Sequence, residues 1–232
     1  MARARPKSNA TKQGATNGRT GRSAAREAEI LDASVDIFHA NGYSATSVED
    51  VAQAVGILKG SLYYYIDSKE DLLVRIVEAV HDEVQKVMDD VLLADEGTPL
   101  ERIAAYVRAQ VDYNAHNIKR MRVYYHDYEQ LSEERLSEVR KRRRAQEQAA
   151  IRVLQEAKEA GEIPADLDER LAAKSMFATI LWMYTWYKPG GNVSAKGLAD
   201  FCAKFVVDGV RGGMAAPAAP KRRATRAAAA KS

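Results

Sequence analysis

Cysteine is almost absent from this chain of 232 residues, which contains only Cys202. A single thiol cannot form an internal disulfide, and this agrees with a reducing compartment. No apolar run approaches the roughly 18 residues that a membrane-spanning helix needs. The basic, polar N-terminus also lacks the apolar segment of a secretory signal. We therefore expect a globular cytoplasmic protein with no membrane contact, whose hydrophobic content of 46% supplies a genuine core.

The sequence also lacks the motifs that catalysis would need. No two histidines or cysteines have the spacing of zinc ligands, and there is no phosphate-binding glycine loop and no nucleophile elbow. His126 and Asp127 are neighbours in the sequence, so on a helix their side chains diverge and cannot form a base with its orienting acid. We expect no catalytic residues, no metal, no cofactor and no enzymatic activity.

Alternating strand patterns are missing as well, whereas apolar residues recur every three or four positions along most of the chain. The start at Thr98 is especially clear, because Pro99 takes the first helical position and Glu101 completes a capping box. The sequence therefore predicts an all-α fold of about nine helices. They cover approximately residues 23–40, 47–55, 58–65, 69–93, 99–117, 121–128, 132–160, 166–187 and 194–210.

Acidic residues are absent from both ends of the chain. Residues 1–26 carry seven basic side chains and residues 215–232 carry five, so the body between them has 23 basic against 32 acidic residues. Both ends are rich in small and polar residues and have little to bury. We expect a disordered basic arm at 1–22 and a disordered basic tail at 214–232. Whether they contact DNA or only aid solubility stays open at this point.

Two short helices joined by a tight turn are predicted between Thr46 and Leu73. Ser47 is the expected N-cap of the first, with Asp50 as its capping-box partner, and Gly56 supplies the turn. Neighbours on a helix point about 100° apart, so the three consecutive tyrosines of the second helix cannot all face one core. The alternative is a pair of core helices, but we favour DNA binding. The expected DNA contacts are Thr46, Ser47, Lys59, Gly60, Ser61, Tyr63, Tyr64, Tyr65 and Lys69.

Residues 56–72 match a longer pattern, G-x-x-K-G-[ST]-L-Y-Y-x-[FI]-x-[ST]-K-[ED]-[ED]-L. The stretch resembles the signature of the TetR family of repressors. That resemblance implies an N-terminal helix-turn-helix DNA-binding domain of three helices, here 23–68, followed by a larger helical ligand-binding and dimerisation domain, here 69–213. Because the second domain of that family varies freely in sequence, the resemblance implies a ligand site without identifying its residues.

Aromatic residues concentrate in two parts of the second domain, around 106–128 and 182–187. An apolar pocket with a few polar groups is the functional interpretation, and ordinary core packing is the alternative for each single residue. The expected ligand contacts are Tyr106, Tyr113, His116, Tyr124, His126, Trp182, Trp186 and Tyr187.

Residues 186–191, with the sequence WYKPGG, resemble a segment in a subgroup of TetR regulators that control lipid and steroid breakdown. Several of those respond to acyl-CoA thioesters, so an acyl-CoA is one candidate effector. The basic run 140–144 has two interpretations, a contact with CoA phosphates or a solvated helix face. We favour the solvated face, since Glu138 and Arg142 have favourable four-residue spacing.

These observations lead to one principal hypothesis, a ligand-responsive transcriptional repressor. We expect a homodimer through the last two helices, where Ala199, Ala203 and Gly209 allow close approach, and a palindromic double-stranded DNA operator. A hydrophobic small molecule would release the operator by tilting the long helix 69–93. The alternative is a nucleoid-associated protein that coats DNA through its basic tails.

Overall fold

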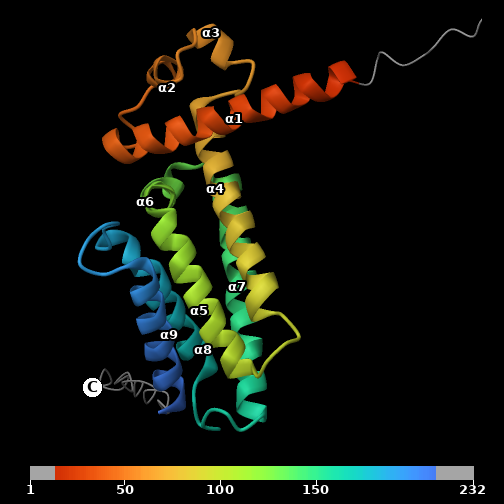
Figure 1. The fold of residues 1–232 in the computed structure, drawn as a ribbon, viewed down its shortest axis with the longest axis vertical. Helices are drawn as coiled ribbons and strands as arrows, with labels where there is room; N and C mark the ends of the chain where they lie inside the picture. The colour runs from red at the N-terminus through yellow and green to blue at the C-terminus, as the bar shows by residue number, and fades with distance from the viewer. Residues whose placement is uncertain (1–13, 213–232) are drawn as a thin grey trace, which may run out of the picture.

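The computed structural model describes residues 14–212, and within that range the protein contains nine α-helices and no β-strand (Figure 1). The predicted all-α fold is confirmed. None of the described helices combines the length and the apolarity needed to cross a membrane. The helices are α1 (Gly14–Asn41), α2 (Val48–Ala54), α3 (Lys59–Leu62), α4 (Lys69–Val87), α5 (Pro99–His116), α6 (Ile118–Asp127), α7 (Glu133–Glu159), α8 (Glu169–Leu181) and α9 (Ala195–Arg211).

Short irregular turns extend three of these helices. A π-helical turn, Met88–Leu92, follows α4, and 3₁₀ turns follow α6 at Tyr128–Gln130 and α8 at Trp182–Thr185. The predicted helix 69–93 is therefore α-helical only to Val87. Met88 and Leu92 are both buried, so the wider turn still contributes to the core.

Two predicted helix starts are wrong. We expected Ser23 to cap the first helix, but α1 already begins at Gly14, and the Ser23 hydroxyl donates instead to the Glu27 carboxylate inside the helix. Part of the expected disordered arm, residues 14–22, is therefore helical, while residues 1–13 and the predicted tail lie outside the described residues. The N-cap of α8 is Asp168 and not Asp166, because the Asp168 carboxylate accepts hydrogen bonds from the first-turn amides.

The apolar residues form two clusters that meet along α4, α6 and α7. The first fills the space between α1, α2, α3 and α4, where Phe38, Leu62 and Leu72 are buried, and it continues to Tyr124 on α6 and Val139 on α7. The second lies between α5, α7, α8 and α9. Figure 1 shows α1 crossing the end of the elongated bundle that α4 to α9 form. The predicted boundary at residue 68 coincides with the N-cap of α4, yet the first half of α4 packs in the head, by which we mean residues 23–68.

The start of α5 forms the predicted capping box. The Glu101 amide donates to the Thr98 hydroxyl at 3.3 Å, and the Thr98 amide donates to the Glu101 carboxylate at 2.9 Å. Ser132 offers a comparison at the N-cap of α7, where its side chain makes no capping hydrogen bond.

Thr98→Ala is expected to lower the free energy of unfolding by about 1 kcal/mol, because one amide of the first turn loses its partner. Ser132→Ala, the matched control, should change it by less than about 0.5 kcal/mol. Chemical denaturation monitored by circular dichroism measures both changes. Equal effects of the two substitutions would show that the capping box of α5 contributes no stability of its own.

Candidate functional site

The predicted helix-turn-helix is present as α2, a turn and α3. The Ser47 hydroxyl accepts from the Asp50 amide at 3.2 Å, the Ser47 amide donates to the Asp50 carboxylate at 2.7 Å, and Gly56 turns the chain with φ +68°. The second helix is shorter than predicted. Beyond Leu62 the backbone amides of Tyr64 and Tyr65 bond to carbonyls three residues back, which tightens the last turn.

The three tyrosines after α3 differ in exposure. The side chain of Tyr64 is 88% exposed and that of Tyr63 is 48% exposed, whereas Tyr65 packs against the apolar cluster of the head. Lys59 and Gly60 are exposed beside them, and Ser61 is half-buried. The Lys59 ammonium lies 3.9 Å from the Glu49 carboxylate, a pair in solvent that a phosphate can replace. This corner of the head thus presents two rings, a cation and a glycine.

Two of the side chains expected to contact DNA, those of Thr46 and Lys69, have hydrogen-bond partners within the chain. The buried Thr46 hydroxyl donates to the Gly42 carbonyl at 2.9 Å. The Lys69 ammonium donates to the carbonyls of Tyr43 and Thr46, both at 3.0 Å, and lies 4.2 Å from the centre of the Tyr43 ring. Because these bonds tie the loop after α1 to the start of α4, both side chains position the head. The exposed Ser47 hydroxyl donates to the Asp50 carboxylate at 2.8 Å.

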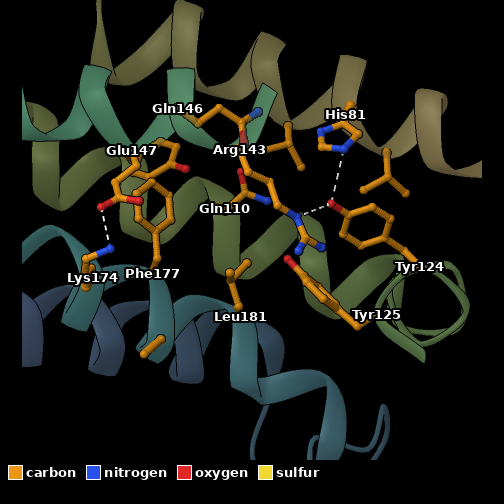
Figure 2. A pocket seen from close by; sticks show the side chains of 14 residues that line it. His81, Gln110, Tyr124, Tyr125, Arg143, Gln146, Glu147, Lys174, Phe177 and Leu181 are labelled. Carbon is orange, nitrogen blue, oxygen red and sulfur yellow. Dashed lines mark hydrogen bonds and ion pairs between the residues drawn. The ribbon is translucent and has the colours of Figure 1, made fainter. Parts of the chain in front are cut away.

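A cavity of about 300 Å³ lies between α4, α5, α6, α7 and α8 (Figure 2). Its apolar wall comes mainly from α4 and α8. Polar side chains enter it from each of the five helices. Those that define its chemistry are His81, Gln110, Tyr124 and Arg143.

A chain of hydrogen bonds runs along one side of the cavity. The Arg143 guanidinium donates from Nε to the Tyr124 hydroxyl oxygen at 2.8 Å, and that hydroxyl lies 3.2 Å from Nε2 of His81. Burial, assisted by the positive charge of Arg143, lowers the pKa of His81 to about 4. His81 is therefore neutral near pH 7, and in the tautomer that carries its proton on Nδ1 its Nε2 accepts a hydrogen bond from the Tyr124 hydroxyl. Burial raises the pKa of Tyr124, so this hydroxyl stays protonated.

The Arg143 guanidinium is enclosed by aromatic rings. It lies 5.0 Å from the centre of the Tyr124 ring, 5.5 Å from that of Tyr125 and 4.3 Å from that of Tyr128. Such contacts stabilise a cation without neutralising its charge.

The structure brings only two of the eight expected ligand residues to this cavity, Tyr106 and Tyr124. The other six lie elsewhere in the structure. The ring of His116 is exposed beside Asp112, His126 packs edge-on against Tyr184, and Trp182 is exposed; the remaining three are Tyr113, Trp186 and Tyr187.

Those last three residues have separate environments. Tyr113 is partly buried beside the apolar cluster of the head. Trp186 and Tyr187 border a shallow hollow at the loop between α8 and α9, and Tyr187 belongs to the core of the α5, α7, α8 and α9 cluster. The WYKPGG segment is therefore separate from the cavity.

Sequence reasoning missed most of the polar lining, in particular His81, Gln110 and Arg143. One signal in the sequence could have identified His81. It follows Val77 by four positions, so it is a polar residue on the buried face of its helix. In the basic run, Arg140, Lys141, Arg142 and Arg144 do form an exposed face, and Arg142 pairs with Asp82 at 2.7 Å. Arg143 is the exception, because it turns inward.

Comparisons with known proteins agree with this architecture. Residues 30–76 match the family described as bacterial regulatory proteins, tetR family, and residues 96–210 match the tetracyclin repressor-like C-terminal domain. The chain belongs to the TetR family. It is a DNA-binding, ligand-binding transcriptional regulator and not an enzyme, as predicted. Among the described residues no group of side chains could hold a metal ion.

Two TetR-type regulators each match about four fifths of this chain. The repressor KstR2 of Mycobacterium tuberculosis is 28% identical over 186 residues, which are 80% of this chain and 92% of KstR2. The structure of that ketosteroid transcriptional regulator superposes with a TM-score of 0.75 over 80% of this chain and 95% of its own. A TetR/AcrR regulator from Thermobifida fusca is 31% identical, with a TM-score of 0.65 over 81% of this chain and 99% of its own.

A more distant structure, AibR in complex with isovaleryl coenzyme A and operator DNA, shares the fold. It is 24% identical, with a TM-score of 0.70 over 82% of this chain and 100% of its own.

Lys69→Met is expected to lower the free energy of unfolding by about 1 to 3 kcal/mol, because the carbonyls of Tyr43 and Thr46 lose their donor. Lys86→Met is the matched control on the same helix, where the ammonium is exposed and pairs with Asp90. It should lower the free energy of unfolding by less than Lys69→Met does, because an ion pair in solvent contributes little. If Lys69→Met left stability unchanged in denaturant titrations but weakened DNA binding, the positioning role would be wrong and the phosphate contact correct.

Proposed function

We propose that the protein is a dimeric cytoplasmic repressor that binds a pseudo-palindromic operator and leaves it when a hydrophobic small molecule occupies the cavity. The observation that supports this most strongly is the shared use of α4. Leu72, Leu73 and Ile76 in its first half are buried in the head, while Val80 and Val84 in its second half line the cavity. A ligand that displaces the second half therefore also moves the surface that carries Tyr63 and Tyr64.

The short helix α6 gives a second connection between the cavity and the head. Its Tyr124 lines the cavity, and its first turns reach α1 and α4 through ion pairs. The Arg120 guanidinium lies 3.3 Å from the Asp32 carboxylate and 3.1 Å from that of Glu83, and Lys119 lies 2.7 Å from Asp36. A shift of α6 at the cavity would change where α1 sits.

The dimer is proposed from the exposed apolar face of α8 and α9. Phe201 is 67% exposed and Phe205 is 60% exposed, and their rings stack with centres 6.3 Å apart. Leu171 is exposed on α8, and Trp182 is exposed on the 3₁₀ turn that follows α8. An apolar face of this kind is covered in the functional state, and a second copy related by a two-fold axis would place two heads on successive half-sites.

An acyl-CoA thioester is one candidate effector, and it rests on the resemblance of the WYKPGG segment. In this structure the carbonyls of Tyr184 and Tyr187 accept hydrogen bonds from Arg122 of α6. The segment therefore contributes to the placement of α6, whichever molecule enters the cavity.

Selection of bound DNA from a random library tests the proposed function. The repressor should enrich one two-fold symmetric sequence, and a variant without residues 1–13 and 214–232 should enrich the same one. If enrichment were absent, or if affinity vanished with the two basic ends, the protein would instead coat DNA without sequence preference.

Tyr64→Ala is expected to reduce the preference for the operator over unrelated DNA by at least about tenfold, because the most exposed ring of the head would lose its contacts with base edges. Lys86→Ala, which changes an exposed residue of α4 outside the head, serves as the control. Competition binding assays measure the preference, and circular dichroism and sedimentation verify the fold and assembly. Unchanged discrimination would remove Tyr64 from the DNA-reading surface.

Phe205→Glu is expected to convert the dimer to a monomer at micromolar concentration, because it places a charge in the apolar face. Lys204→Ala, on the same helix and already exposed beside Asp208, should leave the dimer intact. Sedimentation equilibrium gives both results. A wild-type protein that sediments as a monomer would contradict the proposed architecture.

A further inference from the structure

Two buried polar atoms at the cavity have no hydrogen-bond partner, Oε1 of Gln110 and Nη2 of Arg143. The Gln110 side chain is only 1% exposed. Figure 2 shows both side chains between the Lys174 and Glu147 pair on one side and Tyr124 and Tyr125 on the other. A buried donor or acceptor without a partner costs free energy of folding. A ligand that pairs with these two atoms removes that cost and therefore binds more tightly.

The orientation of the Gln110 amide follows from its neighbours. Nδ2 of Asn114 donates to the Ile180 carbonyl at 3.2 Å, so Oδ1 of Asn114 must be the atom that accepts from Nε2 of Gln110 at 2.9 Å. The free atom of Gln110 is therefore its oxygen. This oxygen accepts a hydrogen bond from a hydroxyl or an amide of a ligand, and it repels a carboxylate placed against it.

The charges at the cavity do not cancel. The Lys174 ammonium lies 2.7 Å from the Glu147 carboxylate, so these two charges neutralise each other. His81 is neutral, and the side chains around Arg143 are tyrosines. Within residues 23–212 no carboxylate forms an ion pair with Arg143, although sixteen other Lys or Arg side chains have one. The cavity is left with one uncompensated positive charge.

We propose that the effector is a small apolar carboxylic acid whose carboxylate binds the Arg143 guanidinium. This inference rests on the proposed function, in which the cavity is the effector site. A carboxylate would take the free Nη2 and complete the ion pair that the chain itself does not supply. The apolar body of the acid would then lie against Val84, Phe177 and Leu181.

The same contact supplies a route to the head. Arg143 donates to the Tyr124 hydroxyl, and Tyr124 belongs to α6. A carboxylate on Nη2 attracts the guanidinium away from the tyrosine oxygen that its Nε contacts. The acid therefore weakens the bond that holds α6 against α7, which a neutral ligand of the same shape does not do.

Calorimetric titration of the full-length dimer without DNA tests the chemistry, with decanoate, methyl decanoate and decanoyl-CoA as probes. The wild type is expected to bind decanoate at least about tenfold more tightly than methyl decanoate, since only the acid pairs with the cation. Arg143→Met should reduce that preference to less than about threefold, and Arg143→Lys should restore part of it. Arg144→Met, at the exposed neighbouring position, should retain the wild-type preference.

Three outcomes would overturn the inference: equal binding of acid and ester by the wild type, tighter binding of decanoyl-CoA than of decanoate, or a preference for the acid that survives Arg143→Met in a folded dimer. Circular dichroism and sedimentation establish the folded dimer for each variant. Because these titrations contain no DNA, their failure concerns only the class of effector. The proposed function fails separately, if a molecule that binds the cavity leaves operator affinity unchanged.

Discussion

The burial of α4 in two places constrains the rest of the structure. Leu72, Leu73 and Ile76 pack in the head, and one to two turns later Val80, His81 and Val84 line the cavity. A helix is stiff over this length, so displacement at the cavity is carried to the head instead of being absorbed between them. Arg120 and Lys119 belong to α6, and their ion pairs with α1 and α4 form a second connection between the cavity and the head. The head is thus attached to the cavity at two points and not through a flexible linker.

The cavity owes its character to Arg143. Three tyrosine rings and one phenolic oxygen hold the guanidinium in place, and none of them cancels its charge. The neutral state of His81 fits this arrangement, because a second cation beside Arg143 would be unfavourable in a buried site. Arg143, Tyr124 and His81 come from α7, α6 and α4, so the placement of one side chain depends on three helices. This dependence makes the cavity a suitable place for a ligand to alter the packing of the bundle.

Local patterns were sufficient to predict the fold. The capping boxes at Ser47 and Thr98 and the turn at Gly56 involve residues within three or four positions of one another, and the structure contains all three. The start of α1 was wrong because Ser23 resembles a cap but pairs with Glu27 within a longer helix. The hydrogen bonds from Lys69 to the carbonyls of Tyr43 and Thr46 could not be predicted in this way, because those residues lie 26 and 23 positions earlier and become neighbours only after folding.

The ligand site could not be predicted to the same extent, because it is assembled from five helices. Residue type suggested Trp182 and Trp186, but both are exposed, while Tyr106 and Tyr124 do reach the cavity. Arg143 is one of five consecutive basic residues, and the sequence does not distinguish it from the other four. Which member of such a run faces inward depends on the rotation of α7 against α4 and α6, and that is a property of tertiary packing.

The central claim is that occupation of the cavity and binding of the operator oppose each other. Its most direct test is the dissociation constant of the selected operator, measured with and without a saturating amount of whichever of decanoate, methyl decanoate and decanoyl-CoA binds most tightly. We predict that the ligand raises this constant by about tenfold or more, and that the operator raises the ligand's dissociation constant by the same factor, as linkage requires. Identical operator affinity with the cavity filled and empty would contradict the account.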